Sequence, residues 1–395
     1  MACIYRTLLV GLLGLSVLAV ASASARTWYV EKDGSGEFAV IQDAVDAASS
    51  GDVIAVGPGR YDDYQTVQGG AYFFDIHVLV PDGFSLSFTG AGVGVTIIGP
   101  ADTGSHENRT YGIAVIGDIG LSVRSMSFEN CSQYSIGTTT GVLDVADCEF
   151  VYEGDSSPVT RGIDGRLSAS RISHCRFTGF HYGLALRSFD GTTSIEDCIF
   201  ENCTVGVYGH SPGQGFVSVS DCDFYCDLAG IGFLDGTSGS IECCRLENCI
   251  LELTNTAEVT VANCEVTRTD GNVALDLRNA DPVTIVDSIF RSNGVVVYLG
   301  SLGLGTIRNN HFLRTGGDYW VYCPYHPSFQ HDIDLSGNYW GTTDVEEIAE
   351  GIWDCQDDDH AYHCVSFEPI ADGPVRVESV SWSSVKGLFG GAGEE

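Results

Sequence analysis

The chain has 395 residues, 49 of them Gly, and carries 53 Asp and Glu against 19 Lys and Arg, which gives a formal net charge of −34 at pH 7. A surface this acidic repels nucleic acid and anionic membranes, so neither is an expected partner. It suits a chain that works outside the cell, and Ca²⁺ is the one cofactor that such carboxylates could attract there. The abundant Gly is typical of turn-rich β-structure rather than of helices.

Residues 1–25 are expected to form a secretory signal peptide. Arg6 supplies the positive start, residues 8–20 form a short apolar stretch, and residues 23–25 (Ala-Ser-Ala) match the small-residue cleavage pattern. The alternative, an uncleaved anchor, would need a longer apolar run. We therefore expect a mature chain from about Arg26 that has no membrane span and is secreted or extracytoplasmic, in the periplasm or at the cell surface.

A six-residue pattern recurs along the middle of the chain. It combines an apolar residue, any residue, Asp, Asn or His, then Cys, any residue and an apolar residue, as in residues 195–200 (Ile-Glu-Asp-Cys-Ile-Phe). Six copies have Cys at the fourth position: Cys148, Cys175, Cys198, Cys222, Cys244 and Cys264. Three more copies have another residue there: Met126, Ser288 and Asn310. The steps between these nine positions run from 20 to 27 residues, a regularity that predicts a repeat architecture.

Each repeat contains alternating apolar residues bounded by Gly, Asn, Asp and Ser, which predicts short strands joined by tight corners. One strand cannot fill a whole repeat, so each repeat must hold two or three. Stacked repeats would pair their strands at a spacing of about 4.8 Å and bury one continuous column of side chains. The predicted fold is therefore all-β, a right-handed parallel β-helix. A leucine-rich repeat has a similar period, but the chain lacks its Leu-x-x-Leu-x-Leu frame.

Two segments are suited to closing the ends of such a solenoid. Near the N-terminus, a Gly-rich turn at residues 33–36 precedes a short amphipathic helix predicted over Phe38–Ala48. Near the C-terminus, residues 337–344 (Gly-Asn-Tyr-Trp-Gly-Thr-Thr-Asp) precede a predicted helix at 345–352. With the repeats, these segments resemble the pectin-lyase-like superfamily of exported bacterial β-helix proteins, and the resemblance covers residues 27 to about 370.

The resemblance implies one β-helix domain over residues 26–373. Its N-terminal cap is expected at 27–61, and its final rung and C-terminal cap at 337–370, each with a short helix that shields an open strand edge. Residues 374–395 depart from the repeat and are expected to form a C-terminal tail, either frayed or used for sorting or docking.

The cysteines divide into two groups. Those at the shared repeat position should form one internal column in which parallel side chains hold the Cβ atoms at the long edge of the disulfide range, so we predict mostly free thiols. Seven disulfides would be the alternative for an exported chain. Cys355 and Cys364 flank an acidic loop and are predicted to form a disulfide. A zinc site with His360 and His363 is the alternative, but this spacing matches no usual structural-zinc frame, and no metal site is predicted.

The resemblance does not specify a reaction, because the family includes enzymes acting on acidic polysaccharides as well as proteins that only bind or display. The catalytic motifs of pectin methylesterases and mannuronan epimerases are missing. Of the polygalacturonase motifs only Gly209-His210 has a partial match, and Ser211 follows it. Lyases with a Lys base are excluded, since the only lysines are Lys32 and Lys386. A Ca²⁺-assisted lyase with an Arg base remains open.

Four glycines open the same strand in successive repeats: Gly162, Gly183, Gly206 and Gly230. Alternation from these glycines places Arg166, Arg187 and His210 in one outward column, with Asp164 and Tyr208 beside it. Like charges so close together call for an anionic partner. We therefore predict a groove for a uronate-bearing glycan, with Arg187, His210 or Arg166 as catalytic proton abstractor and Asp164 and Tyr208 as substrate contacts. The alternative is a solvated face whose arginines pair with Asp164 or with loop carboxylates.

The aromatic-rich segment at residues 319–327 is a second candidate, with Trp320 and Tyr322 as sugar-stacking residues or, alternatively, as packing for a loop. Together these features predict an exported scaffold that binds polysaccharide, a cell-surface glycan or another extracellular ligand without catalysis. The alternative function is an acidic-polysaccharide lyase or hydrolase with its site on the outward column.

Overall fold

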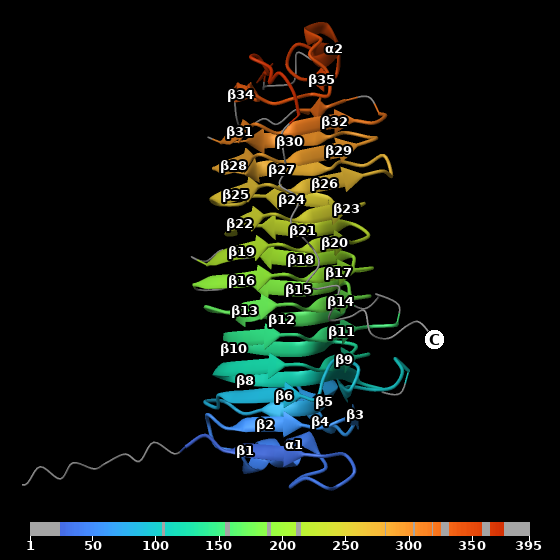
Figure 1. The fold of residues 1–395 in the computed structure, drawn as a ribbon, viewed down its shortest axis with the longest axis vertical. Helices are drawn as coiled ribbons and strands as arrows, with labels where there is room; N and C mark the ends of the chain where they lie inside the picture. The colour runs from blue at the N-terminus through green and yellow to red at the C-terminus, as the bar shows by residue number, and fades with distance from the viewer. Residues whose placement is uncertain are drawn as a thin grey trace, which may run out of the picture.

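The computed structural model describes residues 24–104, 107–154, 159–187, 191–210, 215–280, 282–302, 305–317, 319–324, 332–357 and 364–374. As predicted, it is a nearly all-β, right-handed parallel β-helix of about 12 turns with two short helices (Figure 1). The strands of successive turns lie side by side along the long axis of the molecule.

Each complete turn contributes strands to three parallel sheets. The first sheet consists of β5 (Tyr72–Val80), the first part of β8 (Arg109–Arg124) and of β10 (Tyr134–Ala146), β12 (Arg161–Leu167), β15 (Tyr182–Arg187), β18 (Val205–His210), β21 (Ala229–Leu234), β24 (Ile250–Thr254), β27 (Leu275–Ala280), β30 (Val297–Leu302), β33 (Val321–Tyr322) and β35 (Ile352–Trp353).

The second sheet consists of β1 (Thr27–Val30), β2 (Val53–Val56), β6 (Leu86–Gly90), the second parts of β8 and β10, β13 (Arg171–Ser173), β16 (Thr192–Glu196), β19 (Phe216–Ser220), β22 (Ser238–Glu242), β25 (Val259–Ala262), β28 (Val283–Val286) and β31 (Thr306–Arg308). Because β8 and β10 run through both, the first two sheets are continuous at these turns.

The third sheet consists of β3 (Gly59–Tyr61), β7 (Thr96–Ile98), β9 (Ser127–Glu129), β11 (Glu149–Val151), β14 (Arg176–Thr178), β17 (Ile199–Glu201), β20 (Asp223–Tyr225), β23 (Arg245–Glu247), β26 (Glu265–Arg268), β29 (Ile289–Ser292) and β32 (His311–Arg314). Two further pairs stand outside this scheme: β4 (Gln65–Gly69) is antiparallel to β5, and β34 (Ile333–Asp334) pairs with β36 (Val365–Ser366).

The recurring sequence pattern marks the corner between the second and third sheets. The residue directly before each column position has φ between 50° and 57°: Ser125, Asp147, His174, Asp197, Asp221, Cys243, Asn263, Asp287 and Asn309. This left-handed conformation is one that Asp and Asn tolerate better than most residues, which explains why they dominate the position. The side chain that follows then points into the core.

The six predicted column cysteines are free and buried. Their Sγ atoms donate weak hydrogen bonds to backbone carbonyls, as Cys175 does to Ser173 O at 3.2 Å. Beside them, five phenylalanine rings stack in parallel, with centroids 4.6–5.1 Å apart: Phe128, Phe150, Phe177, Phe200 and Phe224. A second column of buried free thiols, which the sequence pattern did not reveal, contains Cys203, Cys226 and Cys249. Free cysteine packs in these columns as a small hydrophobic residue.

The cysteine arrangement predicts the thiol content of the purified protein. Among the described residues, 12 cysteines are free and one disulfide joins Cys355 and Cys364. Under denaturing, non-reducing conditions we expect a thiol reagent to modify 12 groups, and in the native state few, because all but one of these thiols are buried. A count lower by six would show that the column cysteines are oxidised to disulfides.

Both described helices lie near the ends of the coil (Figure 1). Helix α1 (Ile41–Ala47) starts three residues later than predicted and buries Ile41, Ala44 and Val45 against the first turns. Helix α2 (Val345–Glu350) begins after Asp344, whose side chain accepts hydrogen bonds from the backbone N–H groups of Glu346 and Glu347.

The predicted signal peptide and the C-terminal tail fall almost entirely outside the described residues, so both remain predictions. No helix in the described part of the chain is both long and apolar enough to cross a membrane.

Candidate functional site

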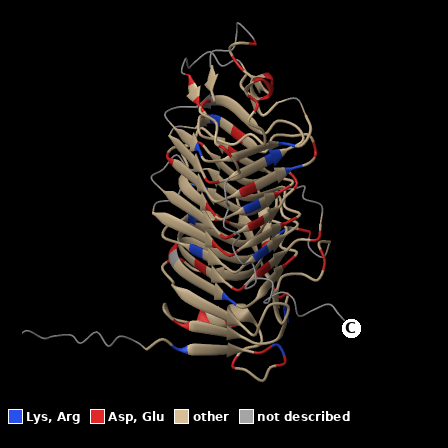
Figure 2. Ribbon diagram, turned by 45° about the horizontal axis from the view of Figure 1, so that its top comes forward, with Lys and Arg blue, Asp and Glu red and all other residues tan. Residues whose placement is uncertain are grey.

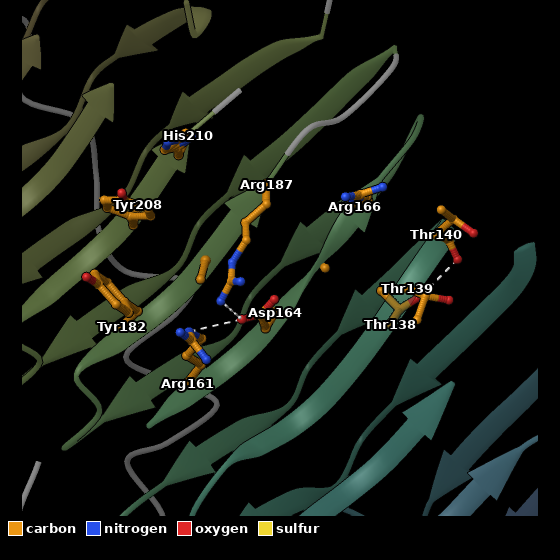
Figure 3. Close-up of a pocket in the computed structure, with 12 residues that line it drawn as sticks. Thr138, Thr139, Thr140, Arg161, Asp164, Arg166, Tyr182, Arg187, Tyr208 and His210 are labelled. Carbon is orange, nitrogen blue, oxygen red and sulfur yellow. Dashed lines mark hydrogen bonds and ion pairs between the residues drawn. The ribbon is translucent and has the colours of Figure 1, made fainter. Parts of the chain in front are cut away.

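A groove of about 740 Å³ lies on the outer face of the first sheet, over β10, β12, β15 and β18 (Figure 3). Its lining consists of Thr138, Thr139, Thr140, Arg161, Asp164, Gly165, Arg166, Tyr182, Ala185, Arg187, Tyr208 and His210. The five residues predicted from the glycine alignment are all present in it. The groove contains three arginines, although the chain has a net charge of −34. Figure 2 shows that acidic residues are distributed along the whole coil, so this grouping of cations is unusual for the molecule.

The strand register brings these side chains together. Ile163, Leu184 and Val207 are register partners and are fully buried, whereas Asp164, Ala185 and Tyr208 form the neighbouring row and line the groove. The outward positions of Asp164 and Tyr208 are those expected from the glycine alignment.

The repeated glycines are required by the core. A Cβ atom at Gly162, Gly183 or Gly206 would lie 2.6 Å from a ring atom of Phe177, Phe200 or Phe224, respectively. The phenylalanine stack thus packs directly under the strands that carry the groove. Any larger residue at these glycines would displace either the strand or the ring.

Asp164 is the electrostatic centre of the groove. Its Oδ2 atom lies 2.9 Å from Arg161 Nε and 2.7 Å from Arg187 Nη2, and the residue is only 8% exposed. Burial raises the pKa of Asp164, while the two guanidinium groups act in the opposite direction. The predicted pairing of arginine with Asp164 is therefore present, yet one carboxylate shared by two arginines leaves excess positive charge.

The alignment of repeats on their glycines did not predict that Arg161 lies in the groove. Strict alternation places residues 161 and 163 on the same side of a strand, and Ile163 is fully buried. In the structure, Arg161 and Ile163 each pair with a residue of β15, whereas Gly162 pairs with none. The regular alternation of side chains along β12 is therefore interrupted at Gly162. Arg161 consequently points into the groove, where 14% of its side chain is exposed.

Tyrosines surround the Arg161 guanidinium. Its Cζ atom lies 5.2 Å from the Tyr134 ring centroid and 5.8 Å from that of Tyr182, and its Nη1 donates a 3.0 Å hydrogen bond to the Tyr134 hydroxyl. The Tyr182 and Tyr208 ring centroids are 4.8 Å apart. Burial raises the pKa of Tyr208, so its hydroxyl remains protonated and able to donate. The groove therefore combines cations with aromatic faces.

Arg166, Arg187 and His210 all line the groove, but their charged groups do not lie in a single column. Arg187 and His210 are register partners, but the Arg187 guanidinium turns back to Asp164 (Figure 3). Arg166 lies apart, just beyond the last register pair of β12 and β15, and it forms no ion pair with another described residue. His210 Nε2 lies 3.3 Å from Asp235 Oδ2. The charged groups diverge because Arg187 and His210 turn to different carboxylates, Asp164 and Asp235.

This geometry favours anion binding over proton transfer. The carboxylate beside Arg187 stabilises the charged guanidinium and so opposes its use as a base. His210 is paired with a carboxylate at the edge of the groove and has 42% of its side chain exposed. Two or three arginines, by contrast, present planar donors suited to carboxylates.

No metal site is evident within the described ranges, where no three His, Cys, Asp or Glu side chains are grouped so as to hold an ion. The acidic loop between the disulfide cysteines lies mostly outside those ranges, so the suggestion of Ca²⁺ stays a prediction.

The second candidate segment divides into two roles. Trp320 is 3% exposed and packs against Trp340, with the Arg314 guanidinium 4.1 Å from its ring centroid, so we assign Trp320 to packing instead of the predicted sugar contact. Tyr322 is partly exposed and stacks on Trp353 with centroids 4.9 Å apart. Neither residue lines the groove.

Comparison with known proteins supports the fold and leaves the reaction undefined. Residues 161–326 match a family model described as "Right handed beta helix region". No curated protein matches the sequence. Among solved structures, pectate lyase Pel9A is similar at 13% identity and a TM-score of 0.44, over 76% of this chain and 78% of that one.

Two further structures show a comparable likeness. The tailspike protein of E. coli bacteriophage HK620, as a double mutant, matches at 13% identity and a TM-score of 0.43, over 72% of this chain and 57% of that one. An α-1,3-glucanase from Streptomyces thermodiastaticus matches at 14% identity and a TM-score of 0.39, over 87% and 67%. Likeness at this level does not assign an activity. The family match over residues 161–326 and the coil of the structure agree in showing a right-handed parallel β-helix protein.

Proposed function

We propose that the protein is an exported scaffold that binds an acidic, uronate-bearing polysaccharide in the groove of the first sheet, without cleaving it. The observation that carries this proposal is the gathering of Arg161, Arg166 and Arg187 beside Tyr182 and Tyr208 in one open groove. Guanidinium groups bind carboxylates through paired hydrogen bonds, and tyrosine offers an apolar face together with a hydroxyl.

The shape of the site also supports a polymer as ligand. The groove is a shallow surface on stacked strands, and small-molecule sites are usually concave pockets that bury most of the ligand. A long chain can instead contact successive turns, each offering the same outward positions about 4.8 Å further along. The surrounding acidic surface would weaken attachment elsewhere on the molecule.

The direct test is to measure binding of the mature protein to polygalacturonate, alginate and uncharged dextran by calorimetry, with and without roughly millimolar Ca²⁺, the range of weak extracellular sites. We expect binding of at least one acidic polymer, no binding of dextran, and no chain cleavage. Release of unsaturated ends, followed by ultraviolet absorbance, would show a lyase, and new reducing ends without that absorbance a hydrolase. Equal binding of dextran would contradict recognition through arginine.

Asp164 makes the groove pH-dependent. Because its pKa is raised by burial, the carboxyl takes up a proton as the pH falls through that raised value, and it then no longer neutralises Arg161 and Arg187. We expect wild-type binding of dextran sulfate, whose charge is constant in this range, to tighten at acidic pH. Asp164→Asn should bind about threefold more tightly at neutral pH and show a weaker pH dependence.

The matched control for this measurement is Asp144→Asn, since Asp144 forms an ion pair with Arg124 on the second sheet. Asp144→Asn also removes one negative charge, but at a site outside the groove. If both variants change the affinity equally, the pH dependence belongs to the net charge of the molecule and not to Asp164.

A further inference from the structure

The groove continues toward the N-terminal end of the coil. A second hollow of about 340 Å³ shares Arg161 and Arg187 with it and is also lined by Arg109, Gln133, Tyr134 and Val159. Arg109 lies on β8 and Tyr134 on β10, the turns that precede β12. Arginines on β8, β12 and β15 therefore border the first sheet, and β10 between them contributes Tyr134.

Aromatic side chains accompany these cations in a row that we call the aromatic row: Phe74, Tyr111, Tyr134 and Tyr182. The centroids of Phe74 and Tyr111 are 5.4 Å apart, and those of Tyr111 and Tyr134 are 5.0 Å apart. Register pairing places Arg161 between Tyr134 and Tyr182, and its guanidinium contacts both rings. All four rings are partly exposed.

The row is continuous with the proposed site at one end and with an exposed hairpin at the other. Tyr182 contacts Tyr208 in the groove. At the far end, Tyr72 and Phe73 in the β4–β5 hairpin are 63% and 51% exposed, and the Arg109 guanidinium lies 5.7 Å from the Tyr72 ring centroid. From β18 to β5 the path crosses five strand spacings, about 24 Å in all.

We propose that the aromatic row is an extended binding track, so that a single linear acidic polysaccharide lies along the coil axis from Tyr208 toward the β4–β5 hairpin; this inference rests on the proposed function. Guanidinium groups beside a row of rings match a polymer that presents both carboxylates and apolar sugar faces. The hydroxyl of Tyr111 remains a donor, because burial raises its pKa. The charge of Arg109, Arg161 and Arg187 selects an anionic chain on a protein that is otherwise strongly acidic.

The track predicts that affinity depends on ligand length. Binding of short and long oligomers of galacturonate and of alginate would be compared for the wild type, Tyr111→Leu and Tyr111→Phe, because Tyr111 lies in the row but does not line the groove. Long oligomers should bind Tyr111→Leu about tenfold more weakly than the wild type, whereas short oligomers, which need only the groove, should lose less than about twofold. Tyr111→Phe retains the ring and should remain within about threefold of the wild type for both lengths.

The control is Tyr225→Leu, which removes a partly exposed tyrosine from the third sheet, and thermal unfolding of each variant would verify folding. A wild type that binds long and short oligomers equally, or a Tyr111→Leu variant that weakens both equally, would overturn the track while leaving the groove intact. Failure of the wild type to bind any of the oligomers would instead refute the proposed function and the track with it.

Discussion

Phe177→Ala is expected to lower the free energy of unfolding by about 3–5 kcal/mol, the usual cost of removing a buried aromatic ring. Phe177 is fully buried, and its ring stacks on Phe150 and Phe200 with centroids 4.6 and 5.0 Å away and planes within 7° of parallel. It also fills the space beside Gly162. The neighbouring rings are held by their own strands, so they cannot close the cavity without breaking strand pairing.

The solenoid form adds to this effect. Each turn contacts mainly the turns above and below, so a defect in the middle weakens two interfaces. Denaturant unfolding followed by far-ultraviolet circular dichroism would measure the change, with Phe216→Ala as control, since Phe216 is 37% exposed on the second sheet. The control should change stability by less than about 0.5 kcal/mol. Similar losses in the two variants would mean that the phenylalanine stack does not stabilise the coil.

The fold was predictable because every turn repeats the same physical requirement. The corner needs a residue that tolerates positive φ, and Asp197 and Asn263 occupy this position in two of the turns. The next side chain is buried in the core, and Cys198 and Cys264 occupy that position. A pattern imposed by geometry at each turn is visible in a single sequence.

The groove was predictable only where alternation of side chains holds. Asp164 and Tyr208 fall in one outward row, as counted from the glycines. Arg161 was missed because the alternation is interrupted at Gly162, and the charged groups of Arg166 and Arg187 diverge because the long Arg187 side chain turns back to Asp164. A strand pattern specifies the direction of Cβ, not the position of a charge several bonds away.

Burial of individual side chains was the other limit. Nothing in the segment around Trp320 separates an exposed ring from a core ring, and only the fold shows that Trp340 packs against it. The second thiol column was missed for a related reason. Cys203, Cys226 and Cys249 follow strands of the third sheet at unequal offsets, two or three residues after Phe200, Phe224 and Leu246, so no fixed motif includes them.

Arg187→Ala is expected to weaken binding of the acidic polysaccharide by about 10- to 100-fold, because a hydrogen-bonded charge pair contributes about 1.5–3 kcal/mol. The variant should fold, since Asp164 keeps its ion pair with Arg161 at 2.9 Å. The Arg187 side chain is 45% exposed, so little packing is lost. Calorimetry with the bound polymer at low and high salt would measure the effect, which should shrink as salt screens the groove.

Arg171→Ala supplies a closely matched control. Arg171 lies on the second sheet, has 56% of its side chain exposed, and is 2.8 Å from Glu196, so this variant also removes one positive charge from an exposed arginine that is paired with a carboxylate. If binding depends on the groove, only Arg187→Ala loses affinity. If it depends on the net charge of the molecule, both variants lose the same small amount, because each makes a protein of charge −34 more acidic by one unit. Equal losses would therefore place the polysaccharide elsewhere on the coil.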